Sequence, residues 1–330
     1  MARVFTIFIL SLFLGLQVNG QLKWQNVDSM YQPLPPSVHI YKTISQLDGK
    51  PNIAYYVEAD LKDKKLDFTV DTTYKRRLTP SKFYEKNEKA LLVVNTTFFS
   101  FATNQNLNVV IKNKKMVGYN IHTINGRGKD TFTYRHVFTS AFGIDKKRRP
   151  DVAYLFTDST LRFVYSSQNP LPVITDSSIN LDTDKVIAMR NNYTNRIGGI
   201  EREQMFKKWK MKTAVGGGPS LLNYGQIRIS NNEELKFAGK AINDNHPRTA
   251  MGYTEDDKLI ILMVEGRNEN ASGATLTQLA QIFKDLGCLE ALNLDGGGSS
   301  CMLVNGKETI KVSDAAGQRP VPAVFIIKQK

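Results

Sequence analysis

The sequence predicts a single α+β domain in which a large, mostly antiparallel mixed sheet is flanked by a few helices. Short apolar segments with the length and spacing of strands outnumber helical patterns along the chain. Consecutive strand-like segments are often separated by short turns, which is typical of antiparallel hairpins. No internal repeat or low-complexity segment points to another architecture.

The first 20 residues have the pattern of a secretory signal peptide. Arg3 supplies a positive charge, residues 4–18 are largely apolar, and a small residue precedes Gln21. This run is short for a membrane span, and no later stretch reaches the ~20 apolar residues that a span needs. We expect a secreted or periplasmic protein with no membrane span, a Pro-rich extended lead-in over 21–50 and one domain over 51–330.

Strands are expected in the first half of the domain at 53–61, 66–70, 90–94, 108–111, 115–119, 138–144 and 152–156. Residues 80–89 have the composition of a short charged helix. The pair 108–111 and 115–119 forms a hairpin around Asn113 and Lys114, because asparagine suits a tight turn. The segment 159–195 contains turn residues and polar patches, and no role is assigned to it.

The second half begins with a strand at 213–215 and a hairpin formed by 249–253 and 259–264. Residues 275–286 give the clearest helical pattern of the chain. Leu276, Leu279, Ala280 and Phe283 recur at helical spacing. The helix starts at a Thr275/Gln278 capping box and closes at Gly287. Strands at 289–294 and 321–327 complete the domain.

Charge and cysteine content limit the classes of function. The formal net charge is +13, but the lysines are scattered and show no nucleic-acid pattern, so no nucleic-acid partner is expected. An exported protein with this excess suits anionic polymers. Cys288 and Cys301 could pair in an oxidising compartment, and we favour two buried small apolar residues instead. Two cysteines are too few for a disulfide scaffold or a structural zinc site.

The segment 293–300, Asn-Leu-Asp-Gly-Gly-Gly-Ser-Ser, carries the strongest chemical signal. An apolar strand ends there in a carboxylate, three glycines and two hydroxyls. Consecutive glycines suit a place where a ligand lies against the main chain, and their N–H groups can form an anion-binding nest. Asp295 could bind a metal, act as an acid or base, or accept a sugar hydroxyl. A tight turn capped by Asp and Ser is the alternative.

Further motifs follow other predicted strands, and their order over about residues 50–328 resembles the phosphodiester glycosidase family. They read Asn-Thr-Thr-Phe-Phe at 95–99, Gly-Gly-Gly-Pro at 216–219, Arg-Thr-Ala-Met-Gly at 248–252, Glu-Gly-Arg at 265–267, Gly-Ala-Thr-Leu-Thr-Gln-Leu-Ala at 273–280 and the 293–300 segment. An Arg-Pro-Val element stands at 319–321. The resemblance implies release of a sugar from a phosphodiester.

The resemblance also implies the roles of individual residues. Asp295 and Glu265 would be the catalytic carboxylates, as paired carboxylates serve most glycoside hydrolysis, and His246 would donate a proton to the leaving phosphate. Arg248 would bind phosphate oxygens in a bidentate way. The remaining substrate-binding residues would be Asn95, Gly217, Gly218, Arg267, Gly297, Gly298, Ser299 and Ser300.

Two positions depart from the family pattern, and several residues keep structural alternatives. Glu265 replaces the usual aspartate, and Thr96 occupies a position that is often small. Asn95 could cap a strand end, His246 could be a surface residue before a proline, and Arg267 could form a structural ion pair. Asn95 also begins one of three glycosylation sequons, with Asn192 and Asn270; we treat them as accidental, because a glycan at Asn95 would contradict its site role.

The sequence thus predicts an exported hydrolase that cleaves an N-acetylglucosamine-like sugar from a glycosyl-1-phosphodiester on a glycan or envelope polymer. The alternative is a non-catalytic protein that binds carbohydrate or anionic glycan in exopolysaccharide assembly. A phosphomonoesterase is disfavoured, because such enzymes use clusters of Asp and His, and the four histidines are scattered. No cofactor is required; a divalent cation such as calcium, held by Asp295 or Glu265, stays open.

Overall fold

The computed structural model describes residues 21–126, 128–157, 164–181, 186 and 207–330. The expected signal peptide and much of 159–195 lie outside these residues. Within them, four antiparallel sheets account for most of the regular structure, and the helices are few and short. The α+β class is confirmed. The strands divide among packed sheets, as long twisted sheets generally do.

The largest sheet contains eight strands. In spatial order they are β1 (Gln25–Asn26), β2 (Val38–Thr43), β3 (Ala54–Asp60), β19 (Lys258–Val264), β18 (Arg248–Thr254), β20 (Cys288–Asn293), β16 (Ser220–Asn223) and β17 (Gln226–Ile227). Strand β18 runs antiparallel to both β19 and β20. The start of β18 therefore lies beside the ends of β19 and β20, so their loops meet.

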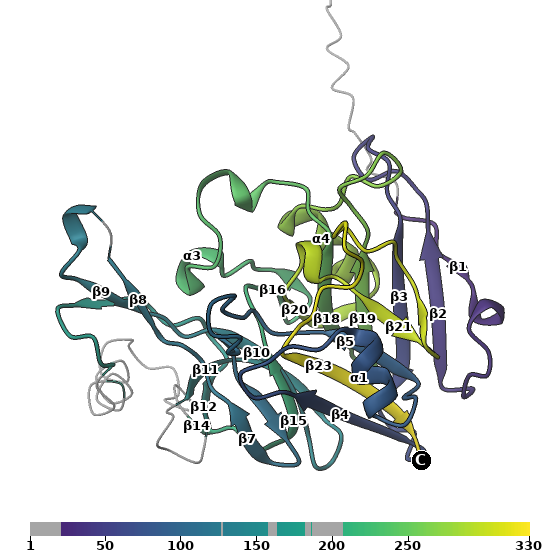
Figure 1. Ribbon diagram of the computed structural model, residues 1–330, viewed down its shortest axis with the longest axis horizontal. Coiled ribbons are helices and arrows are strands. Elements are labelled where there is room, and N and C mark those ends of the chain that lie inside the picture. Colours follow the sequence, from purple (N-terminus) through teal and green to yellow (C-terminus); the bar gives the residue numbers. More distant parts are fainter. Residues whose placement is uncertain (1–20, 127, 158–163, 182–185, 187–206) are drawn as a thin grey trace, which may run out of the picture.

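Three further sheets complete the fold. The five-stranded sheet contains β22 (Lys307–Glu308), β21 (Met302–Val304), β5 (Leu92–Asn95), β23 (Ala323–Gln329) and β4 (Leu66–Thr72). The seven-stranded sheet contains β14 (Lys207–Lys208), β12 (Val164–Ser167), β11 (Pro150–Thr157), β10 (Ser140–Asp145), β15 (Met211–Gly216), β6 (Val110–Lys112) and β7 (Lys115–Gly118). The small sheet contains β13 (Ile174–Asp176), β9 (Tyr134–His136) and β8 (Thr123–Asn125), and β8 and β9 project from the rest of the molecule in Figure 1.

The main core lies between the three larger sheets. One apolar cluster contains Val57 and Ile261 from the eight-stranded sheet, Phe325 from the five-stranded sheet, and Phe142 and Val215 from the seven-stranded sheet. Burial of such side chains is the dominant favourable term in folding. The loops at the strand ends are thereby held on a rigid body.

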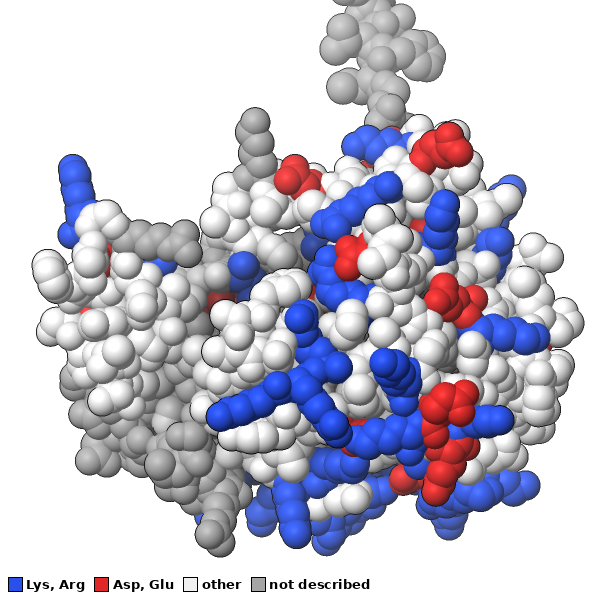
Figure 2. All heavy atoms as spheres, in the orientation of Figure 1, with Lys and Arg blue, Asp and Glu red and all other residues white. Residues whose placement is uncertain are grey.

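The helices cover outer faces of the sheets. Helix α4 (Leu276–Asp285) buries its apolar stripe against the outer face of the eight-stranded sheet. Its predicted capping box at Thr275 is present. Helix α1 (Pro80–Lys86) packs on the five-stranded sheet and lies over β5 and β23 in Figure 1. A single turn, α3 (Asn231–Glu234), leads toward the strand-end loops. Lys and Arg gather over the lower part of the face in Figure 2, around α1.

Most strand predictions hold, with one clear difference at the N-terminus. The expected extended lead-in over 21–50 contributes β1 and β2 to the eight-stranded sheet, where β2 pairs along the length of β3. Val38 and Ile40 are buried and alternate with partly buried residues, a strand pattern that the neighbouring prolines obscure in the sequence. Cys288 and Cys301 are free and buried, as favoured.

Candidate functional site

Asp295 stands on a loop that is held on both sides by main-chain contacts. Its N–H donates to the Thr96 carbonyl at 2.8 Å, and its own carbonyl accepts from Asn95 Nδ2 at 2.6 Å. Two residues later, the Gly297 N–H donates to the Pro247 carbonyl at 2.8 Å. The loop after β20 is thus fastened to the end of β5 and to the start of β18, and Asp295 is held in one position.

Asn95 is a positioning residue in this structure. Its side chain is fully buried. Besides the bond to the Asp295 carbonyl, its Oδ1 accepts from Thr249 Oγ1 at 3.0 Å and from the Cys301 N–H at 3.1 Å. The amide therefore joins three strand ends, and the expected contact with substrate is replaced by contacts with protein. A glycan on this buried amide is incompatible with the fold, whereas the sequon at Asn192 lies outside the described residues.

The glycines after Asp295 serve close packing. A Cβ on Gly297 would meet the guanidinium of Arg267 at 3.1 Å, and a Cβ on Gly298 would collide with Arg319 and Asp314. The N–H groups of Gly297, Ser299 and Ser300 all donate to main-chain carbonyls. The predicted anion nest is therefore wrong for these three groups. The glycines instead let two arginines lie directly on the loop.

The two serines of this loop are buried and face inward. Ser299 hydrogen-bonds to the Asp295 carboxylate and lies 3.4 Å from Arg319 Nη1. Ser300 Oγ lies 3.3 Å from Thr249 Oγ1. Ser299 thus sets the orientation of Asp295, and Ser300 ties the loop to β18, so neither hydroxyl is presented to a ligand.

The glycine cluster at 216–219 also differs from its prediction. Its N–H groups donate to the carbonyls of Val109, Ser140 and Asn293. A Cβ on Gly217 would strike the Asn293 carbonyl, and one on Gly218 would strike the Glu234 carboxylate. Gly217 and Gly218 therefore permit a close approach of two chain segments and donate no N–H to an anion.

That close approach brings Lys236 to the site, a residue that the sequence analysis did not identify. Its ammonium lies 4.5 Å above the ring of Phe98, and it interacts electrostatically with Glu234 and Asp295. Glu234 is buried and accepts hydrogen bonds from Ser140 Oγ at 2.8 Å and Ser230 Oγ at 2.6 Å. Glu234 thereby fixes the segment that delivers Lys236.

The pKa values of Asp295 and Lys236 move toward each other. Burial raises the pKa of Asp295 to about 6, opposed by the Ser299 hydrogen bond and the Arg319 and Lys236 charges. Burial lowers the pKa of Lys236 to about 8, opposed by Glu234 and Asp295. Such convergence toward neutral pH is a property of functional sites. At pH 7 Asp295 is mainly ionised and Lys236 mainly protonated.

His246 and Arg267 lie together at another edge of the loop. Arg267 Nη2 lies 3.3 Å from His246 Nδ1, and Arg267 is exposed with a left-handed φ of 65°. Burial lowers the pKa of His246, and the charges of Arg248 and Arg267 lower it further. His246 is therefore neutral at pH 7, which weakens the expectation that it donates a proton to a leaving phosphate.

Arg248 is deeply buried and largely committed to the main chain. Its Nε donates to the Ala274 carbonyl at 2.8 Å and its Nη2 to the Asp244 carbonyl at 3.1 Å. Its guanidinium stacks on Phe237 at 5.6 Å, and it is 2% exposed. Burial lowers its pKa to about 10. Arg248 thus holds the loops of Ala274 and Asp244 in place. Because its Nε already donates to a carbonyl, Arg248 cannot bind a phosphate in the bidentate way that uses Nε.

Glu265 has structural contacts as well. Its two carboxylate oxygens accept from Asn268 Nδ2 at 3.1 Å and from the Lys311 N–H at 2.9 Å. These bonds hold the 265–271 turn against the loop that follows β22. No hydrogen bond or ion pair joins Glu265 to Asp295 within the described ranges, so a catalytic role for Glu265 stays a prediction.

Arg319 completes the site from the C-terminal side. It forms a bidentate ion pair with Asp314, at 2.7 and 2.8 Å, and its guanidinium lies 5.5 Å over the ring of Phe101. The Arg-Pro-Val element was noted in the sequence, but its arginine was not assigned to the site. The structure thus adds Arg319 and Lys236 to the groups around Asp295.

A divalent cation at Asp295 stays a prediction. No group of three or more His, Cys, Asp or Glu that could hold a metal occurs among the residues that the structure describes. The charged neighbours of Asp295 are Lys236 and Arg319. Lys236 and Arg319 in turn lie beside the carboxylates of Glu234 and Asp314, so the calcium considered from the sequence would need further oxygen ligands to complete a site at Asp295.

Comparisons with known proteins address the family. A phosphodiester glycosidase model matches residues 166–328. The chain is 39% identical over 85 residues to the SPbeta prophage-derived uncharacterized protein YomE of Bacillus subtilis (strain 168), covering 26% of this chain and 13% of YomE. It is 32% identical over 127 residues to N-acetylglucosamine-1-phosphodiester alpha-N-acetylglucosaminidase of Bos taurus, covering 38% of this chain and 22% of the relative. The alignments thus span about a fifth or less of these relatives.

The solved structures support the fold over most of the chain. The zebrafish N-acetylglucosamine-1-phosphodiester alpha-N-acetylglucosaminidase catalytic domain, auto-inhibited by its pro-peptide, matches with a TM-score of 0.60 at 20% identity, covering 94% of this chain and 89% of that one. A hypothetical protein from Synechocystis matches with a TM-score of 0.57 at 13% identity, covering 93% and 68%. The match over residues 166–328 and the shared fold thus support the phosphodiester glycosidase family for this chain.

Proposed function

We propose that the protein is an exported hydrolase that releases an N-acetylglucosamine-like sugar from a glycosyl-1-phosphodiester on a glycan or envelope polymer. The observation that carries the proposal is the Asp295 carboxylate, fixed by Ser299 and enclosed by the charges of Lys236 and Arg319. A carboxylate for the sugar and cations for the phosphate are the two requirements of this substrate.

The chemistry of the leaving group explains why one carboxylate suffices. Hydrolysis breaks the bond between the anomeric carbon and the phosphate oxygen, and water supplies the new hydroxyl of the sugar. The departing group is a phosphate monoester, whose second pKa is about 6. Such a group leaves as an anion without prior protonation. A general acid, the role expected of His246 and open to a second carboxylate, is then unnecessary.

Asp295 supplies the base or the nucleophile. With its pKa raised to about 6, it is ionised at neutral pH yet basic enough to take a proton from the attacking water. Direct attack on the anomeric carbon is the other route, and the stereochemistry of the released sugar distinguishes the two. Lys236, Arg319 and the exposed Arg267 would stabilise the charge that develops on the phosphate.

The test is product analysis with N-acetylglucosamine-1-phospho-methyl-mannoside and with UDP-N-acetylglucosamine. We expect free sugar, with a loss of at least about 100-fold in kcat for Asp295→Asn. Glu265→Gln serves as the matched variant and should retain most of kcat. Unchanged turnover in Asp295→Asn would refute the assignment. Binding without product would favour the non-catalytic glycan-binding alternative.

Metal dependence and location are tested in the same preparation. Because no group of three or more His, Cys, Asp or Glu that could hold a metal occurs among the described residues, we expect activity to survive a chelator and to gain nothing from added calcium. No helix in the described part of the chain is long and apolar enough to cross a membrane. Export by cleavage before Gln21 would be checked by N-terminal sequencing of the mature protein from its host.

A further inference from the structure

A cavity lies on the outer face of the seven-stranded sheet, away from Asp295. It has a volume of about 850 Å³ and is bordered by β14, β15, the β6–β7 hairpin and the β10–β11 turn. Strand β10 runs between the two regions: Ser140 bonds to Glu234 near the Asp295 site, and Asp145 lines this cavity. Five strand residues span ~17 Å, so the two regions are separate.

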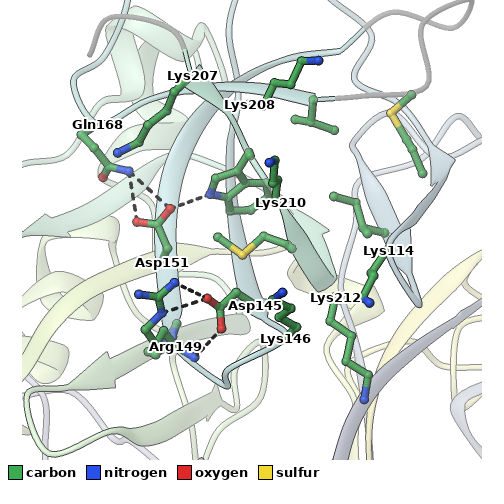
Figure 3. A pocket seen from close by; sticks show the side chains of 16 residues that line it. Lys114, Asp145, Lys146, Arg149, Asp151, Gln168, Lys207, Lys208, Lys210 and Lys212 are labelled. Carbon is green, nitrogen blue, oxygen red and sulfur yellow. Dashed lines mark hydrogen bonds and ion pairs between the residues drawn. The ribbon is translucent and has the colours of Figure 1, made fainter. Parts of the chain in front are cut away.

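The floor of the cavity is formed by side chains that hydrogen-bond to one another. The indole of Trp209 lies against β10, where a Cβ on Gly143 would meet it at 2.6 Å. Trp209 is buried, and its Nε1 donates to Asp151 Oδ2 at 2.5 Å. Gln168 Nε2 donates to both oxygens of Asp151, at 3.1 and 3.3 Å. Figure 3 shows Gln168 and Asp151 held together at one side of the cavity.

The rim is strongly cationic. Seven basic and two acidic side chains line the cavity. Asp145 is already paired with Arg149 at 2.7 Å, and Lys212 with Asp67 at 2.7 Å. Lys114, Lys146 and Lys210 are exposed and form no ion pair with a described residue. Figure 3 places their side chains around the floor. The cavity therefore carries a positive charge that its own carboxylates do not neutralise.

We propose that this cavity is a non-catalytic binding site for an acidic polysaccharide. The lysine rim would contact its carboxylate or phosphate groups, and the Asp151 carboxylate and Gln168 amide would accept hydroxyl hydrogen bonds. Nucleic acid fits less well, because single strands bind by stacking bases on exposed aromatic rings and the Trp209 ring is buried. The inference does not depend on the hydrolase activity, since it concerns a different surface.

The test compares two triple variants of the full mature chain. Lys114→Gln, Lys146→Gln and Lys210→Gln remove charge from the rim. Lys82→Gln, Lys89→Gln and Lys284→Gln remove the same charge from exposed lysines elsewhere. Binding of polygalacturonate, of a poly(glycerol phosphate), of neutral dextran and of oligo-dT is measured by calorimetry at low and high salt.

We expect both acidic polymers to bind and dextran to bind weakly. The rim variant should lose about tenfold in affinity, because each exposed charge contact contributes about two- to threefold at low salt. The control variant should lose less than about twofold. Gln168→Ala, which leaves the net charge unchanged, should weaken polygalacturonate further by disturbing the floor.

Three outcomes would overturn the proposal. Equal losses in the rim and control variants would mean that the overall charge, and no specific site, attracts the polymers. Tighter binding of oligo-dT than of either acidic polymer would mean that the ligand class is wrong. Unchanged affinity in Gln168→Ala together with loss in the rim variant would overturn the hydroxyl contacts on which the assignment to a polysaccharide rests. The circular dichroism spectrum and melting temperature of each variant serve as its folding control.

Discussion

Lys236 and Asp295 together predict a bell-shaped dependence of activity on pH. Asp295 must be ionised, so activity should rise through its pKa of about 6, and Lys236 must be protonated, so activity should fall through its pKa of about 8. At pH 7 each group is about 90% in the required state, and at pH 5 or pH 9 one of them is only about 10% so. We expect a maximum near pH 7 and about a tenfold decrease at both extremes.

Lys236→Arg is the perturbation that isolates the alkaline limb. Arginine keeps the positive charge beside Asp295 and does not deprotonate in proteins. The alkaline limb should therefore vanish up to about pH 10, while the acidic limb stays near pH 6. Lys236→Met removes the charge instead, and it should lower kcat at every pH by about 10–100-fold, because one stabilising cation is lost.

The assay is kcat/KM for release of sugar from the mannoside phosphodiester between pH 4.5 and 9.5. Lys82→Arg, an exposed lysine on α1, is the matched control and should leave the profile unchanged. Circular dichroism at each pH shows whether the fold is retained. An alkaline limb that remains near pH 8 in Lys236→Arg would show that another group titrates there, and the role given to Lys236 would be wrong.

Three further predictions concern the loop that carries Asp295. Asn95→Ala leaves the Cys301 N–H and the Asp295 carbonyl without a buried partner, so the free energy of unfolding in urea should fall by about 2–5 kcal/mol; exposed Asn270→Ala should change it by less than about 0.5 kcal/mol. Gly298→Ala pushes the guanidinium that rests on this glycine away from the loop, so kcat/KM should fall while the melting temperature changes little; equal losses of both would point to general unfolding. Asp295→Asn should raise the free energy of unfolding by up to about 3 kcal/mol at pH 7, because the pKa of Asp295 in the folded protein, about 6, exceeds the ordinary 3.8 and the fold disfavours the charged form. The gain should disappear below pH 4, where the carboxyl is protonated in both states. A loss of stability at pH 7 would contradict the raised pKa.

The fold was predictable where local pattern and tertiary environment agree. The helix Leu276–Asp285 has a capping box at Thr275, an apolar stripe and a glycine stop, and each of these is a local signal. The lead-in was missed for the opposite reason. Val38–Thr43 alternates buried and partly exposed residues, but three prolines precede it and mask the strand pattern. What makes it a strand is its pairing with β3, which the local sequence does not show.

The site was located by its motifs, whereas the orientation of its groups was not. Consecutive glycines indicate that another group lies close to the main chain, but the sequence does not identify that group. At Gly217 the neighbour is the Asn293 carbonyl, and at Gly298 it is an arginine guanidinium. An anion was the natural hypothesis for both, and in both the space is occupied by the protein itself. A count of main-chain donors is therefore needed before a glycine-rich loop is called an anion site.

Lys236 shows why some functional residues carry no signal in a single sequence. It lies outside every motif, directly after a one-turn helix, and its chain neighbours have no periodic pattern. Burial lowers its pKa, and the opposing charge of Asp295 comes from a loop after β20 that is distant in sequence. The space for its stem exists because Gly218 has no side chain, since a Cβ there would lie 2.7 Å from Lys236 Cε. Gly218→Ala should therefore displace Lys236 and shift the alkaline limb, and an unchanged limb in a folded Gly218→Ala protein would mean that the glycine serves Glu234 alone.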